Sequence, residues 1–184
     1  LVVSFTQCTQ LPKAGFHTRD RNQPAYPLQA RSLDGGRTWQ TIRTPAPSPG
    51  NRGFSADEHM IPELRVAKAL ELGLEPLPRP CPGGIDFTHP DFAMMCARTG
   101  LGGGVTAWFY LSTDRAHTWQ GPYSLPMFGQ TGIEARTDVI INGPEDCMLF
   151  VAAATESGEE GKGVLLARTT AGGQTFQLVS WVAV

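Results

Sequence analysis

The stretch that decides the fold is RSLDGGRTWQTI, at residues 31–42. Its order of Ser, Asp, Gly, Thr and Trp returns in LSTDRAHTWQGPY, at residues 111–123, and more weakly in ARTTAGGQTFQLV, at residues 167–179. Aligned on their first Ser or Thr, the three copies lie 80 and 57 residues apart. A segment that recurs at this spacing indicates a fold built from repeated units.

Each copy is typical of a tight turn between two antiparallel strands. In the first copy, we expect Asp34 to accept hydrogen bonds from backbone amides of its own turn, as short acidic side chains do. Gly36 allows a positive φ where the chain reverses, Thr38 closes the turn through its hydroxyl, and Trp39 can bury its ring against a neighbouring sheet. The first copy begins at Ser32, and the other copies contribute Ser112, Asp114, Thr118 and Trp119, then Thr169, Gly173, Thr175 and Phe176.

Short apolar or alternating runs separated by Gly, Pro, Asp or Ser dominate the rest of the chain, and this cadence predicts an all-β architecture. The predicted strands are Leu1–Thr6, Pro27–Arg31, Trp39–Thr44, Ile85–Thr88, Phe92–Arg98, Val105–Leu111, Trp119–Leu125, Thr137–Ile141, Cys147–Ala154, Gly163–Arg168 and Thr175–Val182. The first and last runs read as strands already in progress. We therefore expect the sequence to be part of a longer chain.

One segment departs from this pattern, SADEHMIPELRVAKALELGL at residues 55–74. Ser55 and Glu58 have the spacing of a capping box, and Gly73 stands near a plausible helix stop. We predict one short helix here, within an insertion of about residues 45–84. This insertion accounts for the longer first spacing between the copies.

Composition and charge exclude several classes of protein. The formal net charge is −2 and the sequence pI is about 6.1, so the chain lacks the basic footprint of a nucleic-acid-binding protein. No apolar stretch approaches the roughly 18 residues that a membrane-spanning helix needs. The four cysteines are far apart, without a C-x-x-C pair, which argues against a zinc site. Free buried thiols are favoured over disulfides for Cys8, Cys81, Cys96 and Cys147.

The repeated turns resemble the Asp-boxes of sialidases and other β-propeller proteins. In that family each box lies between the third and fourth strands of a blade, on the side away from the active site. The resemblance spans 1–184 and implies about three four-stranded blades of a six-bladed propeller, with boxes near 32–39, 112–119 and, in degenerate form, 169–176. Missing blades of the same propeller, or self-association, would complete such a fold.

The resemblance also implies a function, exo-glycoside hydrolysis of a terminal acidic sugar without a metal or cofactor. Sialidases hold the substrate carboxylate with arginines, use an Asp as acid/base, and use a Tyr nucleophile activated by a Glu. Asp20 lies 14 residues before Asp34, where the family carries its acid/base. The alternative for Asp20, between Arg19 and Arg21, is a solvated charge cluster. The Arg-Ile-Pro motif of the family does not occur upstream of Asp20.

A second group of candidates lies in GIEARTDVIINGPEDC, just before the strand predicted at Thr137–Ile141. Here Arg136 would clamp a carboxylate and Glu134 would raise the basicity of a tyrosine, with Asp138 beside them. The alternative is an ordinary salt-bridged entry to a strand. Both interpretations remain open at this point.

Further candidates for substrate binding are Asp86, His89 and Asp91, which alternate with apolar residues in GIDFTHPDFAMM, and Arg52 on a glycine-flanked loop. His89 precedes a proline and is also consistent with a bulge at a strand edge. Two of the tyrosines are not expected to be the nucleophile, because Tyr110 lies in an apolar run and Tyr123 lies just after a box. The family places its tyrosine late in the propeller, beyond this chain, so these residues alone are expected to lack a complete site.

Two other functions fit the same pattern. A non-catalytic propeller of this kind would bind glycans or proteins as a scaffold, since the fold does not determine the function. Another glycosidase on the same fold would show paired acidic residues instead of an arginine cluster. In each case the expected partner is a carbohydrate, a glycoconjugate or a protein. Secretion or a periplasmic location is favoured by the resemblance alone.

Overall fold

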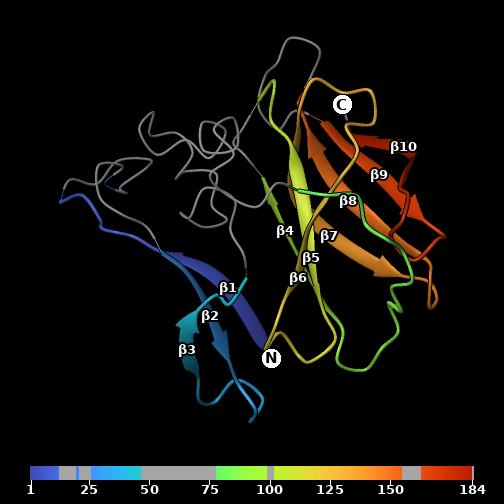
Figure 1. The fold of residues 1–184 in the computed structure, drawn as a ribbon. Coiled ribbons are helices and arrows are strands. Elements are labelled where there is room, and N and C mark those ends of the chain that lie inside the picture. The colour runs from blue at the N-terminus through green and yellow to red at the C-terminus, as the bar shows by residue number, and fades with distance from the viewer. Residues whose placement is uncertain (13–19, 21–25, 47–77, 99–101, 155–162, 184) are drawn as a thin grey trace.

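The computed structural model describes residues 1–12, 20, 26–46, 78–98, 102–154 and 163–183. Within these ranges the chain forms three antiparallel sheets that lie side by side (Figure 1). No described residue belongs to a helix that is long and apolar enough to cross a membrane. The strands are β1 (Val2–Gln7), β2 (Tyr26–Arg31) and β3 (Gln40–Arg43); β4 (Ala93–Arg98), β5 (Ala107–Ser112) and β6 (Gln120–Ser124); and β7 (Ile133–Ile141), β8 (Cys147–Ala153), β9 (Gly163–Thr169) and β10 (Gln177–Ala183).

Each sheet is a meander, because every strand pairs with the next strand in the chain. The β7–β10 sheet has four strands, whereas the other two sheets show three strands each among the described residues. The all-β prediction is therefore confirmed for these residues. The helix predicted at 55–74 lies outside the described residues, as does most of the insertion.

The predicted strand Ile85–Thr88 is wrong, because these residues form a loop that bridges to the β7–β10 sheet. The amide of Ile85 donates to the carbonyl of Gly172 at 3.1 Å, and the amide of Phe87 donates to Pro144 at 2.7 Å. The side chains of Ile85 and Phe87 are buried in the core. The alternating apolar side chains of this segment therefore anchor a loop. Its backbone amides donate to carbonyl groups of neighbouring loops and not to an adjacent strand.

The strand predicted at Thr137–Ile141 begins four residues earlier than expected, at Ile133. Ile133 pairs with Ala153, and the register then shifts before Thr137 pairs with Val151. Glu134, Arg136 and Asp138 therefore lie inside β7, not before it. The shift is a bulge, which sequence alternation alone does not reveal.

The first two repeated turns have the same hydrogen bonds; we call them the Ser32 turn (residues 32–39) and the Ser112 turn (residues 112–119). In the first, Asp34 Oδ1 accepts from the Arg37 and Thr38 amides at 3.0 and 2.9 Å, and Oδ2 accepts from the Thr38 hydroxyl at 2.7 Å. The equivalent distances at Asp114 are 3.0, 2.9 and 2.6 Å. These bonds lower the pKa of both carboxyl groups below the usual value, because the ionised form is the better acceptor.

The third copy, the Thr169 turn (residues 169–176), keeps the backbone path but not the acidic centre. Gly172 and Gly173, three and four residues after Thr169, have φ of 54° and 82°. The equivalent residues of the Ser112 turn, Arg115 and Ala116, have φ of 58° and 61°. The Thr169 hydroxyl accepts from Gly173 N at 3.1 Å, as Ser112 Oγ accepts from Ala116 N at 2.8 Å. With alanine in place of the aspartate, the turn lacks the carboxylate that the other two share.

We expect Ala171→Asp to stabilise the protein by about 0.5–2 kcal/mol at pH 7, because it restores the missing acceptor. The new carboxyl group should have a folded pKa below its unfolded value of about 3.9. Its contribution is then present above about pH 4 and is lost as the pH falls toward the folded pKa. Urea unfolding at pH 7 and pH 3 measures this, with Ala171→Asn as the uncharged control. The gain should be smaller at pH 3 than at pH 7, so an equal gain at the two pH values would contradict the mechanism.

The sheets pack through one contact that the Ser112 turn and the Thr169 turn each make with the preceding sheet. In both turns the aromatic residue seven positions after the first Ser or Thr contacts a residue of the preceding sheet. That residue lies three positions before the first Ser of the preceding sheet's own turn. Trp119 donates its indole N–H to Gln29 Oε1 at 3.1 Å, and Gln29 Nε2 donates to the Ala116 carbonyl at 2.8 Å. The rings of Phe176 and Phe109 lie 5.8 Å apart. We call this the turn–strand contact.

Two apolar clusters fill the spaces that these contacts span. The larger joins the β4–β6 sheet to the β7–β10 sheet around Phe109, Leu149 and Leu165, all fully buried. The second surrounds Trp108 and Tyr110 on the other face of β5. Alternate residues of β5 thus serve two different interfaces, as the two faces of a strand allow.

The four cysteines are free thiols, but the expectation that they are buried is wrong for Cys8, which is exposed, whereas Cys81 and Cys147 are buried and Cys96 is half-buried. Only Cys96 and Cys147 lie on strands, and burial raises the pKa of the Cys147 thiol to about 12. A thiol with so high a pKa is not a nucleophile at neutral pH. Among the described residues, no group of three His, Cys, Asp or Glu side chains is placed to hold a metal ion.

Candidate functional site

Strand register divides the molecule into two rims. Val2 pairs with Arg31 next to the Ser32 turn, and Ala93 pairs with Ser112, so these strand ends lie at the rim that carries the turns, which we call the turn rim. The other ends of the same strands, at Gln7 and Arg98, lie at the opposite rim. β7 begins at the opposite rim and ends at the turn rim, because Ile141 pairs with Cys147, the neighbour of the Thr169 turn.

Glu134 lies at the opposite rim and is fully buried. Its Oε1 accepts a hydrogen bond from the Gly102 amide at 3.0 Å. The next residue, Ala135, has φ of 45°, which is the left-handed region that residues other than glycine rarely adopt. A bulge that re-aims a side chain, a strained backbone and a buried carboxylate therefore coincide within two residues, a combination that is over-represented at functional sites.

Two segments that run side by side hold Glu134 in place. Gly104 N donates to the Thr131 carbonyl at 2.8 Å, and Ile133 N donates to the Val105 carbonyl at 3.0 Å. Gly132 sits between them, and a Cβ atom at this position would lie 2.1 Å from the Gly102 carbonyl oxygen. The absence of a side chain at Gly132 thus allows the contact that brings the Gly102 amide to Glu134.

Asp20 also belongs to the opposite rim. Its amide donates to the Thr9 carbonyl at 2.8 Å, just beyond the end of β1, and the residue is half-buried. Asp20 and Glu134 are thus at the same rim, but Asp20 lies in a loop beside the end of β1 and Glu134 lies on β7. Arg52 and the side chain of Arg136 lie outside the description of the structure, so their roles stay predictions.

The remaining candidates do not join this pair. Asp86 Oδ1 accepts from the Thr88 amide and hydroxyl, at 2.9 and 2.6 Å, within its own loop. His89 Nδ1 accepts from the Asp91 amide at 3.1 Å. These residues precede β4 at the turn rim, so they cannot face the same ligand as Asp20 and Glu134. The bulge interpretation of His89 is not supported either, since His89 lies in a loop.

Asp138 is exposed in the middle of β7, where its Oδ1 accepts from the Val139 amide at 2.8 Å. It borders a hollow of about 370 Å³ between β4 and β7, whose other walls include Met94 and Cys96. Most of the residues that line the hollow are apolar. Asp138 therefore lies between the two rims, not beside Glu134.

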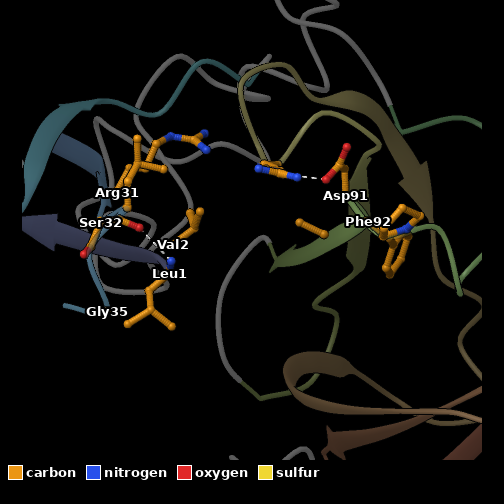
Figure 2. Close-up of a pocket in the computed structure, with 11 residues that line it drawn as sticks. Leu1, Val2, Arg31, Ser32, Gly35, Asp91 and Phe92 are labelled. Atoms are coloured by element: carbon orange, nitrogen blue, oxygen red, sulfur yellow. Dashed lines mark hydrogen bonds and ion pairs between the residues drawn. The ribbon is translucent and has the colours of Figure 1, made fainter.

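A larger hollow of about 540 Å³ lies at the turn rim, between the β1–β3 sheet and the β4–β6 sheet. Arg31 and Asp91 line it from the two sheets, and Asp91 forms an ion pair with Arg115 (Figure 2). Nη2 of Arg31 is buried and has no hydrogen-bond partner among the residues that the structure describes. Sequence reasoning missed Arg31, because a residue at the end of a strand gives no signal of what it faces. This hollow is remote from Asp20 and Glu134.

Two of the tyrosines have structural roles. The Tyr110 hydroxyl accepts from the Trp108 indole at 3.0 Å, and burial raises the pKa of Tyr110. Tyr123 packs against Phe109, and the Arg79 guanidinium lies 5.5 Å from the centre of its ring. Both side chains are buried, so neither is available to attack a substrate.

Comparison with known proteins gives only a distant likeness. No protein-family model matches the chain, and no curated protein matches its sequence. Among solved structures, one described as NanB plus Optactamide has a TM-score of 0.46 at 15% identity, over 86% of this chain and 19% of that one. A NanB sialidase from Streptococcus pneumoniae, in complex with a chlorobenzylammonio ethanesulfonate, has a TM-score of 0.44 with the same identity and coverage. The chain thus spans about a fifth of these proteins.

Proposed function

We propose that the protein is a sialidase-like exo-glycoside hydrolase that acts on terminal acidic sugars. One observation carries the proposal. Two turns with the same aspartate-centred hydrogen bonds lie at one rim, and a fully buried carboxylate, Glu134, lies at the other. The resemblance to Asp-box propellers implies this arrangement, with structural turns at one rim and catalytic residues at the opposite rim.

Glu134 has the environment that a polarising carboxylate requires. Its burial excludes water, and a carboxylate that accepts a hydrogen bond from a hydroxyl in such surroundings increases the nucleophilicity of that oxygen. The bulge and the Gly102 amide fix the direction of the carboxylate. Tyr110 and Tyr123 are committed to packing, and the side chain of Tyr26 lies outside the description of the structure. Glu134 would act on the tyrosine that the resemblance places late in the propeller.

Asp20 is the proposed acid/base and Arg136 the proposed carboxylate clamp. Asp20 is half-buried, and its carboxyl group would donate a proton to the leaving oxygen of a sugar bound at this rim. Arg136 is two residues from Glu134 along β7, and a guanidinium matches a sugar carboxylate through two parallel hydrogen bonds. Arg52 would be a second clamp.

Hydrolysis of a fluorogenic sialoside by the protein that contains these residues tests the proposal. We expect Asp20→Asn to reduce kcat by about 10²–10⁴-fold, the usual contribution of general acid–base catalysis. Glu145→Gln, which removes an exposed carboxylate near the turn rim, is the control and should retain activity. Full activity in Asp20→Asn would remove Asp20 from the mechanism. Sialoside binding without turnover in the unaltered protein would instead support the non-catalytic scaffold.

A further inference from the structure

The Ser32 turn lacks the contact that the other two turns make. Trp119 is 8% exposed and Phe176 is 8% exposed, because each packs against a preceding sheet. Trp39, at the same position of the Ser32 turn, is 44% exposed. Its indole N–H donates to the Gly36 carbonyl of its own turn at 2.9 Å. Among the described residues, no sheet occupies the place in front of Trp39.

On the face of the sheet beside Trp39, β1 and β2 present apolar residues, whereas β3 presents Thr41 and Arg43. Phe5 pairs with Leu28, and Val3 pairs with Ala30, so all four residues lie on the face of the β1–β3 sheet that points away from Gln29 and the β4–β6 sheet. Phe5 is 42% exposed and Val3 is 47% exposed. In the other two sheets the corresponding face is buried against a neighbour, for example at Trp108 and Leu165, which are fully buried.

The other half of the turn–strand contact is present at the far end of the molecule. Leu166 lies three positions before Thr169, as Gln29 and Phe109 do relative to Ser32 and Ser112. It points away from the core, because its neighbours in sequence, Leu165 and Ala167, face the larger apolar cluster.

Phe150, which pairs with Leu166 and so shares its face of the sheet, is also only half-buried. Ile140, on the same face, is 44% exposed. No turn among the described residues packs an aromatic ring against Leu166. The described residues make the turn–strand contact twice. Trp39 has the aromatic position of a third such contact and Leu166 has the strand position, but the two do not meet within one molecule.

We propose that Trp39 of one molecule packs against Leu166 of a second copy of this chain, joining the β1–β3 sheet of one copy to the β7–β10 sheet of the other. The second copy is the occupant that the fold itself specifies, because it offers the strand position that the turn–strand contact uses. The two surfaces differ, so the association is head-to-tail. Both surfaces carry exposed apolar side chains, and the burial of these side chains supplies the driving force.

Sedimentation velocity over a range of protein concentrations tests this interface. We expect a mass that rises with concentration above the 19.9 kDa of one chain. Trp39→Arg and Leu166→Arg should each weaken association at least about tenfold, as the loss of a central apolar anchor does. The control is Leu33→Arg, at a residue of the same turn that is 86% exposed and should leave association unchanged.

Mixing the two variants gives the decisive measurement. The intact Leu166 of Trp39→Arg meets the intact Trp39 of Leu166→Arg, so a mixture should recover one full contact and associate more strongly than either variant alone. Circular dichroism checks the fold of each variant. If Leu166→Arg does not fold, the association of Trp39→Arg compared with the unaltered protein tests the proposal by itself. A monomer at all concentrations, or a mixture no stronger than its components, would overturn the proposal. Sialoside hydrolysis is a separate measurement, and neither result determines the other.

Discussion

Replacing Trp119 with alanine should lower the free energy of unfolding by about 3–5 kcal/mol, the usual cost of truncating a buried tryptophan. The ring is 8% exposed and packs in the cluster around Trp108 and Tyr110. The change also removes the indole donor from Gln29, which is fully buried and would keep an acceptor without its partner. Urea unfolding followed by circular dichroism measures the loss.

Trp39→Ala provides a matched control, since Trp39 has the same position in an equivalent turn. Trp39 is 44% exposed, and its indole N–H donates to a carbonyl of its own turn, so the expected loss is less than about 1 kcal/mol. Both variants must be measured in dilute solution, where association through Trp39 does not contribute. Equal losses would show that the aromatic ring stabilises the turn itself, and that the turn–strand contact is not what holds the sheets together.

Sequence reasoning succeeded where the partners are close along the chain. The acceptor role of Asp34, the closing hydroxyl of Thr38 and the reversal at Gly36 all depend on atoms within four residues. Such interactions follow from local geometry, so the same residue types in the same order predict the same turn. The strands flanking the turns were predictable for the same reason, because alternation is a local pattern.

It failed where a residue depends on a distant partner. Ile85 and Phe87 alternate with polar residues as in a strand, but the loops at Gly172 and Pro144 receive their amides. The bulge at Glu134 was also invisible, because the Gly102 amide that fixes it lies 32 residues away. Nothing in the sequence separates Trp39 from Trp119, since what differs is whether another sheet covers the ring.

The candidate site shows the same limit. Glu134 and Asp20 were selected by resemblance, and strand register places both at the rim opposite the turns. Asp86, His89 and Asp91 were selected for their chemistry in sequence, but they precede β4 at the turn rim. A pattern of residue types therefore identifies candidates, whereas strand direction decides which of them can meet the same ligand.

Gly132→Ala should destabilise the protein by about 3 kcal/mol or more, at the upper end of the cost of overpacking. The added Cβ would lie 2.1 Å from the Gly102 carbonyl oxygen, and that atom belongs to the backbone. It cannot rotate away, so the segments at Gly104 and Ile133 must separate and their hydrogen bonds must lengthen. Thermal unfolding measures the loss, and a displaced Gly102 amide would also release Glu134.

Gly143→Ala is the matched control, because both glycines have backbone conformations that alanine adopts without strain. Its added Cβ would find Asp146 Cβ at 3.9 Å, an ordinary contact, so the expected change is within about 0.5 kcal/mol. Both variants lose the backbone flexibility of glycine, so the difference between their stabilities measures the cost of the steric collision. If Gly132→Ala were as stable as Gly143→Ala, the close approach of the two segments would be wrong, and the position of Glu134 that depends on it would be wrong as well.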